Sequence, residues 1–182
     1  GLEAINGTLS FDVGGIRVDG VRARVGRGDV VFGGRIAMEG FAPSDLNLTA
    51  TGERMNIRYI DGFPAVVDAD LALRGTMTAP VLSGTVTVRD ALWSRRFEAT
   101  PDILALATGE KGPIGAPITT SAVPLRLDIH VVAPGTLRIE NNLARVRASA
   151  DLRLGGTMDR PQLFGRAEIV RGDLSFEGNR YR

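Results

Sequence analysis

The chain has 182 residues, which is enough for one domain with a substantial core. Its 22 basic and 21 acidic residues nearly balance, so it lacks the strong positive field that gathers nucleic acid. The absence of cysteine excludes disulfides, thiol catalysis and cysteine metal sites. Hydrophobic residues make up 43% of the chain but aromatic residues only 5%, and the abundance of Val, Leu, Ile and Ala favours β-strands.

Apolar and polar residues alternate with a period of two along most of the chain, which predicts strands. Turn signals such as Asn6-Gly7, Asp19-Gly20 and Asp61-Gly62 separate the alternating runs. The pattern predicts an all-β fold, an elongated antiparallel sheet of about a dozen strands. In chain order the clearest runs cover residues 9–13, 21–25, 36–38, 46–50, 55–59, 67–73, 82–88, 125–131 and 146–154.

One stretch between these runs departs from the alternation. Thr100-Pro101-Asp102 combines a capping residue, a proline suited to the first helical position and an acid for the first turn. We therefore expect at most one short helix, near residues 101–108. Residues 109–122, which include Pro113 and Pro117, are predicted to form a long loop.

A segment of the chain occurs twice: the pattern of residues 69–84 returns in residues 150–165. Each copy contains an alternating strand, a Gly-Thr turn, a proline and a second strand that opens with Leu-x-Gly. Such repetition is typical of folds that grow by stacking similar units. We expect a single domain over residues 1–182, with two repeat-like units at about 1–99 and 123–182 joined by an insertion at 100–122. Both ends fall within the repeating pattern, so we interpret the chain as a fragment of a longer protein.

One face of each predicted strand is apolar and the other is polar, as in a sheet with one solvated face. The apolar face is covered either by a second sheet, in a closed sandwich, or by bending of one elongated sheet into an open trough. Alternation alone leaves both possibilities open. The candidate lining residues of a trough are Val67, Ala69, Leu71, Leu73, Leu82, Val86, Val88, Leu125, Leu127, Ile129, Val131, Val146, Ala148, Ala150, Leu152, Leu154, Leu174 and Phe176.

Residues suited to catalysis are few. The single histidine, His130, falls on the polar side of its predicted strand, and no serine or cysteine partner suggests itself. Asp68 and Asp70 share a strand face, and we interpret them as solvated residues because no further ligand cluster accompanies them. Gly26-x-Gly28 lies between strands and is no dinucleotide fingerprint. We predict no enzymatic activity, no cofactor and no metal.

The tripeptide Arg-Gly-Asp occurs at residues 27–29 and again at 171–173. Gly-Asp is common in turns, so both copies predict the opening of a hairpin. An adhesin-like repeat domain on a cell surface is the weaker alternative interpretation.

The element Leu-x-Gly-Thr-x-x-x-Pro-x-Leu-x-Gly begins at Leu73 and again at Leu154. Together with the segments around 123–129, 137–142 and 167–181, it resembles the C-terminal domain of the TamB family and its AsmA-like relatives. TamB is the inner-membrane-anchored part of the translocation and assembly module of double-membraned bacteria. The resemblance covers residues 60 to 182.

The resemblance implies a sheet bent into a half-pipe, called a β-taco, with an apolar interior. Such proteins are similar to bridge-like lipid carriers that span the periplasm and conduct phospholipid acyl chains between the inner and outer membranes. Phospholipids are thus the implied partners, together with an outer-membrane barrel protein of the TamA or BamA type that is met through segments outside this chain. The alternative is a scaffold or chaperone for outer-membrane barrel assembly that works by strand addition at sheet edges.

Overall fold

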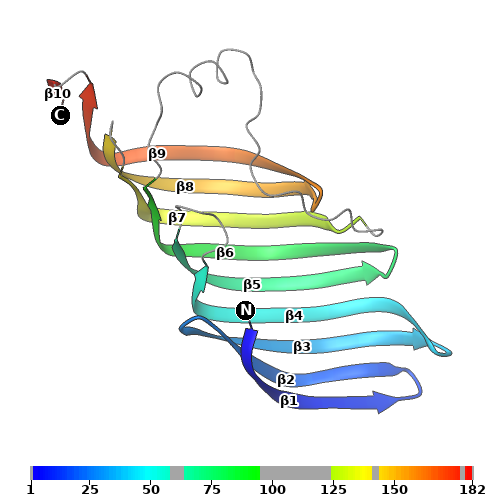
Figure 1. Cartoon of the computed structure of the whole chain (residues 1–182). Coiled ribbons are helices and arrows are strands. Elements are labelled where there is room, and N and C mark those ends of the chain that lie inside the picture. Colours follow the sequence, from blue (N-terminus) through cyan, green and yellow to red (C-terminus); the bar gives the residue numbers. More distant parts are fainter. Residues whose placement is uncertain (1, 58–63, 95–123, 141–143, 177–178, 182) are drawn as a thin grey trace.

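The structure is a computed structural model that describes residues 2–57, 64–94, 124–140, 144–176 and 179–181. The described residues form one ten-stranded sheet in which the strands follow one another in chain order (Figure 1). The predicted all-β, elongated fold is confirmed. The strands are β1 (Leu2–Asp12), β2 (Gly15–Val25), β3 (Gly28–Glu39), β4 (Ala42–Ile57), β5 (Ala65–Thr76), β6 (Ala79–Trp93), β7 (Arg126–Glu140), β8 (Ala144–Thr157), β9 (Arg160–Phe176) and β10 (Asn179–Tyr181).

The sheet is mixed, which corrects the prediction of purely antiparallel pairing. Every neighbouring pair is antiparallel except β6 and β7, which run parallel, with Leu82 opposite Leu127. A parallel pair needs a connection of a dozen residues or more to bring the chain back to the same end of the sheet, and the stretch between β6 and β7 is long enough. The predicted helix near 101–108 and the predicted loop at 109–122 lie outside the described residues.

The two copies of the repeated segment build the same hairpin. In the β5–β6 turn the hydroxyl of Thr76 accepts a hydrogen bond from the Ala79 N–H, at 3.1 Å. In the β8–β9 turn the hydroxyl of Thr157 accepts one from the Arg160 N–H, at 3.3 Å. The Gly-Thr pair of the repeat thus closes each turn with a side-chain hydrogen bond.

The glycine of the repeated Leu-x-Gly element also has one role in both copies. Gly84 has a φ of 138° and Gly165 a φ of 133°, a region that residues with a Cβ rarely adopt. A Cβ on either glycine would collide with the carbonyl oxygen of the neighbouring strand, that of Asp70 or Asp151 respectively. Only glycine allows this close approach of two strands, which explains why the element retains it in each unit.

Replacement of Gly84 by alanine should lower the free energy of unfolding by about 1–3 kcal/mol, because the new Cβ strains both the backbone and the β5–β6 ladder. Urea denaturation followed by circular dichroism measures this loss. Gly33→Ala is the matched control, since the nearest atom to its Cβ would be the Thr49 hydroxyl at 3.5 Å, and it should change stability little. Equal losses in the two variants would contradict this role of Gly84.

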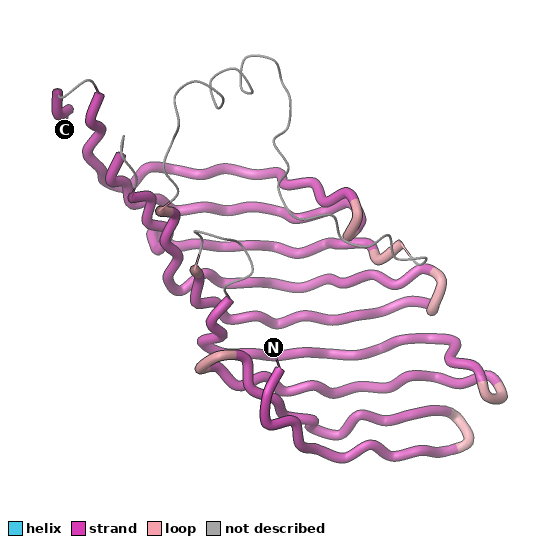
Figure 2. Tube along the Cα trace, viewed as in Figure 1, coloured by secondary structure: helices cyan, strands magenta, loops and turns pink. Residues whose placement is uncertain are grey.

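A line of β-bulges crosses the sheet and bends it. One strand of each pair gains residues relative to its partner near Arg54 in β4, Arg89 in β6, Gly135 in β7 and Val170 in β9. Bulges increase local twist and turn a strand. Figure 2 shows that neighbouring strands bend in the same direction. The aligned bulges therefore curve the whole sheet rather than one strand.

Candidate functional site

Apolar side chains on one side of the sheet lie opposite one another in rows that cross the strands, and we call this side the apolar face. Each row passes from strand to strand through directly opposed residues, without a charged member. One row joins Ala23, Val30, Gly52, Ala69, Val86, Val131, Leu152 and Gly165. A second joins Val21, Phe32, Ala50, Leu71, Gly84, Ile129, Leu154 and Leu163, and a third joins Val18, Gly34, Leu48, Leu73, Leu82 and Leu127.

The apolar face is only partly covered. Among the described residues no large side chain is fully buried, whereas a sealed sandwich buries its inward leucines completely. The predicted lining residues that are buried are Val67, Ala69, Leu127, Ile129, Val146, Ala148 and Ala150. Those that remain half-buried are Leu71, Leu73, Leu82, Val86, Val88, Leu125, Val131, Leu152 and Leu154.

Most of the predicted lining residues therefore share one face and continuous rows. Leu125 lies just before β7, where its carbonyl accepts a hydrogen bond from the Met158 N–H at 2.9 Å. Leu174 and Phe176 belong to β9, but their side chains lie outside the described part of the structure. Their assignment to the lining stays a prediction.

The apolar face also extends over β2, β3 and β4, which the predicted lining omitted. Ala23 and Val30 are buried, and Leu48 faces Leu73. These strands show the same alternation as the later ones but lack the repeated Leu-x-Gly element. The period of two was the signal that could have added them.

A small hydrophobic cluster fills the bend. Ala65, Val67 and Ala91 are buried there, and Ala91 has no exposed surface. They pack against Met55, Ile57, Val86, Val88 and Leu137, which come from both sides of the line of bulges. The bend thus folds the apolar face toward itself and makes that face the concave side of a half-pipe.

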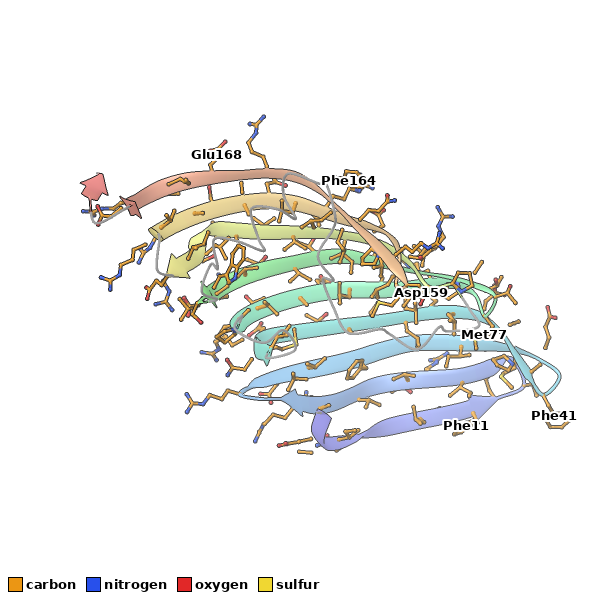
Figure 3. The ribbon with its side chains drawn as sticks, turned by 45° about the horizontal axis from the view of Figure 1, so that its top comes forward. Phe11, Phe41, Met77, Asp159, Phe164 and Glu168 are labelled. Atoms are coloured by element: carbon orange, nitrogen blue, oxygen red, sulfur yellow. The ribbon has the colours of Figure 1, made fainter. Side chains whose placement is uncertain are left out.

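The tips of the tight hairpins carry exposed apolar side chains along one rim. Figure 3 shows Phe41, Met77 and Asp159 at successive hairpin ends. Phe41 and Val13 are fully exposed, and Met77 and Met158 are about two-fifths exposed. Tight turns are normally polar, so these exposed apolar side chains distinguish this edge of the sheet.

The opposite face is polar and held by ion pairs between neighbouring strands. Arg153 forms an ion pair with Asp128 at 2.7 Å, and the His130 ring shares a hydrogen bond of 2.7 Å with the Asp151 carboxylate, both across β7 and β8. His130 is half exposed, on the polar side where its strand position predicted it. Exposed ion pairs of this kind contribute about 0–1 kcal/mol each.

Asp68 has a structural role at the bulges. Its carboxylate accepts a hydrogen bond from the backbone N–H of Arg54 at 2.8 Å and another from the Arg89 side chain, so it joins the bulged residues of β4 and β6. The Arg54 N–H and then the Arg89 side chain lower the pKa of Asp68 below its ordinary value. The carboxylate of Asp70, two residues on, forms no hydrogen bond or ion pair within the described ranges.

Because the folded-state pKa of Asp68 is lowered, its carboxylate stabilises the fold above about pH 4 and loses this effect as the pH falls through the lowered pKa. Asp68→Asn should therefore reduce the free energy of unfolding at pH 7 by about 1–2 kcal/mol, and by less at pH 3. Urea titrations at both pH values measure the difference. Asp70→Asn is the control and should show a small effect that is independent of pH; the same pH dependence in Asp70→Asn would remove Asp68 from this role.

The two Arg-Gly-Asp sequences occupy different structures. The first begins at the β2–β3 turn, where Gly26 has a φ of 62°. The second lies inside β9, with Arg171 opposite Arg147 and Asp173 opposite Arg145 on β8. The prediction that both open a hairpin is wrong for the second copy, because β9 continues through it as far as Phe176.

Within the described ranges, no group of three His, Asp or Glu side chains is placed to hold a metal ion. The same part of the chain contains no helix long and apolar enough to cross a membrane.

An open, curved, single-layer sheet with one apolar concave face defines a class of elongated half-pipe proteins. The model of the TamB C-terminal domain family matches residues 19–182, so the chain belongs to that family. Searches of curated proteins and of solved structures gave no match. The family is a transport and assembly module of the bacterial envelope, and it is associated with the outer-membrane partner TamA.

Proposed function

We propose that the concave apolar face holds phospholipid acyl chains and conducts them between the inner and outer membranes. The observation that carries the proposal is the set of uncharged rows that cross the sheet with half-exposed leucines. Acyl chains cover such leucines while headgroups remain in water. The chain would then be a periplasmic segment of a protein anchored in the inner membrane.

The dimensions support movement rather than storage at one point. The longest rows cross eight strands, which at ~4.8 Å per strand gives a path of roughly 34 Å. One acyl chain spans about half of a ~30 Å hydrocarbon core, so the path is about twice as long as the chain that it holds. A lining of Val, Leu, Ile and Ala offers no polar group that would trap a lipid at one position.

Assembly of outer-membrane barrels is the second candidate function. The sheet begins at β1, and β10 pairs with β9 over three residues only. Backbone groups at such edges accept an added strand. In that case an unfolded barrel strand, rather than lipid, would be the bound partner, and an outer-membrane protein of the TamA or BamA type would receive it.

Leu152→Arg tests the lipid proposal. Leu152 is half-buried within a row, between Val131 and Gly165, so an arginine there can reach water and should cost about 1–2 kcal/mol rather than the several kcal/mol of a charge in a sealed core. The variant should remain folded by circular dichroism, and mass spectrometry should find several-fold less phospholipid in the purified protein than in the wild type.

The control is Arg126→Leu on the polar face, which should leave the phospholipid content unchanged. Leu127→Asp, at a buried position of the same apolar face, should lower stability more than Leu152→Arg. Wild-type protein that carries no phospholipid but binds unfolded barrel strands would contradict lipid conduction and favour barrel assembly.

A further inference from the structure

The polar face carries a row of three arginines that lie directly opposite one another. Arg138 of β7 faces Arg147 of β8, and Arg147 faces Arg171 of β9. Directly opposed residues have Cβ atoms about 5 Å apart, and like charges in this arrangement destabilise a sheet. A folded protein keeps such a row only with compensation from another charge.

The compensation from the protein itself is incomplete. Arg138 holds Asp90 with two hydrogen bonds, of 2.9 and 3.2 Å. Arg145, one row further along, lies between Glu140 and Asp173 in the register. Among the residues that the structure describes, Arg147 and Arg171 form no ion pair, and both are exposed.

Two other arginines in the sheet also lie directly opposite each other, but a carboxylate of the protein neutralises one of them. Arg17 of β2 faces Arg35 of β3, and Asp12 contacts Arg35 at 3.0 Å. A carboxylate on the adjacent strand therefore neutralises one member of that pair. The Arg147–Arg171 pair has no such carboxylate within the described ranges.

The unpaired arginines border a hollow. A depression of about 880 Å³ is lined by four arginines and two carboxylates, together with Val170 at the bulge: Arg138, Arg145, Arg147 and Arg171, and Glu140 and Asp173. Arg145 lies between the two carboxylates in the register, which leaves Arg147 and Arg171 as the arginines in the hollow without an ion pair among the described residues. Two guanidinium groups side by side present several N–H donors to one anion. A phosphate group, with three or four acceptor oxygens, fits that donor set better than a carboxylate does.

We propose that Arg147 and Arg171, with Arg138 and Arg145 beside them, form a binding site for a phosphate group on the polar face of the sheet. The site goes beyond the proposed function, because it lies on the face opposite the acyl-chain rows. The phosphate belongs either to a lipid headgroup or to a free phosphate ion, since the same donors bind both.

Isothermal titration calorimetry on the whole chain at low ionic strength tests the site by measuring the affinity for two probes, inorganic phosphate and dihexanoyl phosphatidic acid. Arg147→Gln/Arg171→Gln should weaken binding by about tenfold or more, since charge-assisted hydrogen bonds are lost. Without ligand, the same variant should melt at a higher temperature than the wild type, because two opposed like charges are gone. Binding of both probes identifies the phosphate group as sufficient, and binding of the lipid alone identifies a headgroup site.

The matched control is Arg74→Gln/Arg126→Gln, which removes the same charge from exposed arginines elsewhere on the polar face. It should leave the affinity for either probe within about twofold of the wild type, given the screening of distant exposed charges. The proposal is overturned if neither probe binds, if the control weakens binding equally, or if Arg147→Gln/Arg171→Gln lowers the melting temperature or loses the strand signal in circular dichroism.

Discussion

The two-residue period of an extended chain determines this structure. Each strand turns its odd and even residues to opposite faces, so a sequence that alternates apolar with charged residues produces a sheet with one apolar side. The described strands form a single sheet, so within them no second sheet covers that side. Without a binding partner, the sheet can shield its apolar side from water by curving. The aligned bulges near Arg54, Arg89, Gly135 and Val170 provide this curvature. Among the described residues, Ala91 in the cluster at the bend is the most completely buried.

The partial exposure of the apolar face lowers the stability of the chain alone and leaves a surface that an apolar ligand can cover. Half-exposed leucines such as Leu71, Leu82 and Leu152 leave hydrophobic stabilisation unrealised in the chain alone. A ligand that covers them recovers that free energy without having to displace a packed core. Because no charge interrupts the rows, the recovered free energy is similar at each position, which is what a path for a sliding apolar chain requires. Fixed polar contacts stay on the other face, where Asp68 and the Arg153–Asp128 pair hold neighbouring strands together.

Much of this arrangement could be predicted from the sequence, because it depends on local pattern. The repeated element specified the same turn at Thr76 and Thr157, and the alternation placed Leu127, Ile129 and Leu152 on one face. The parallel pairing of β6 with β7 depends on the long connection between the two strands. The sequence of neither strand indicates it. The bulges could not be predicted because the chain alternates normally on both sides of an added residue such as Arg89. The sequence pattern therefore does not show where the extra residue is inserted. The row of arginines was missed because register between strands is a tertiary property.

Acyl chains should contact the concave face of the sheet and no other face. A photo-crosslinking amino acid placed in turn at each position from Ala150 to Leu154, in cells, tests it most directly. We expect phospholipid adducts at Ala150, Leu152 and Leu154 and none at Asp151 and Arg153, a labelling pattern with a period of two. Equal labelling at all five positions, or no lipid adduct at any of them, would contradict it.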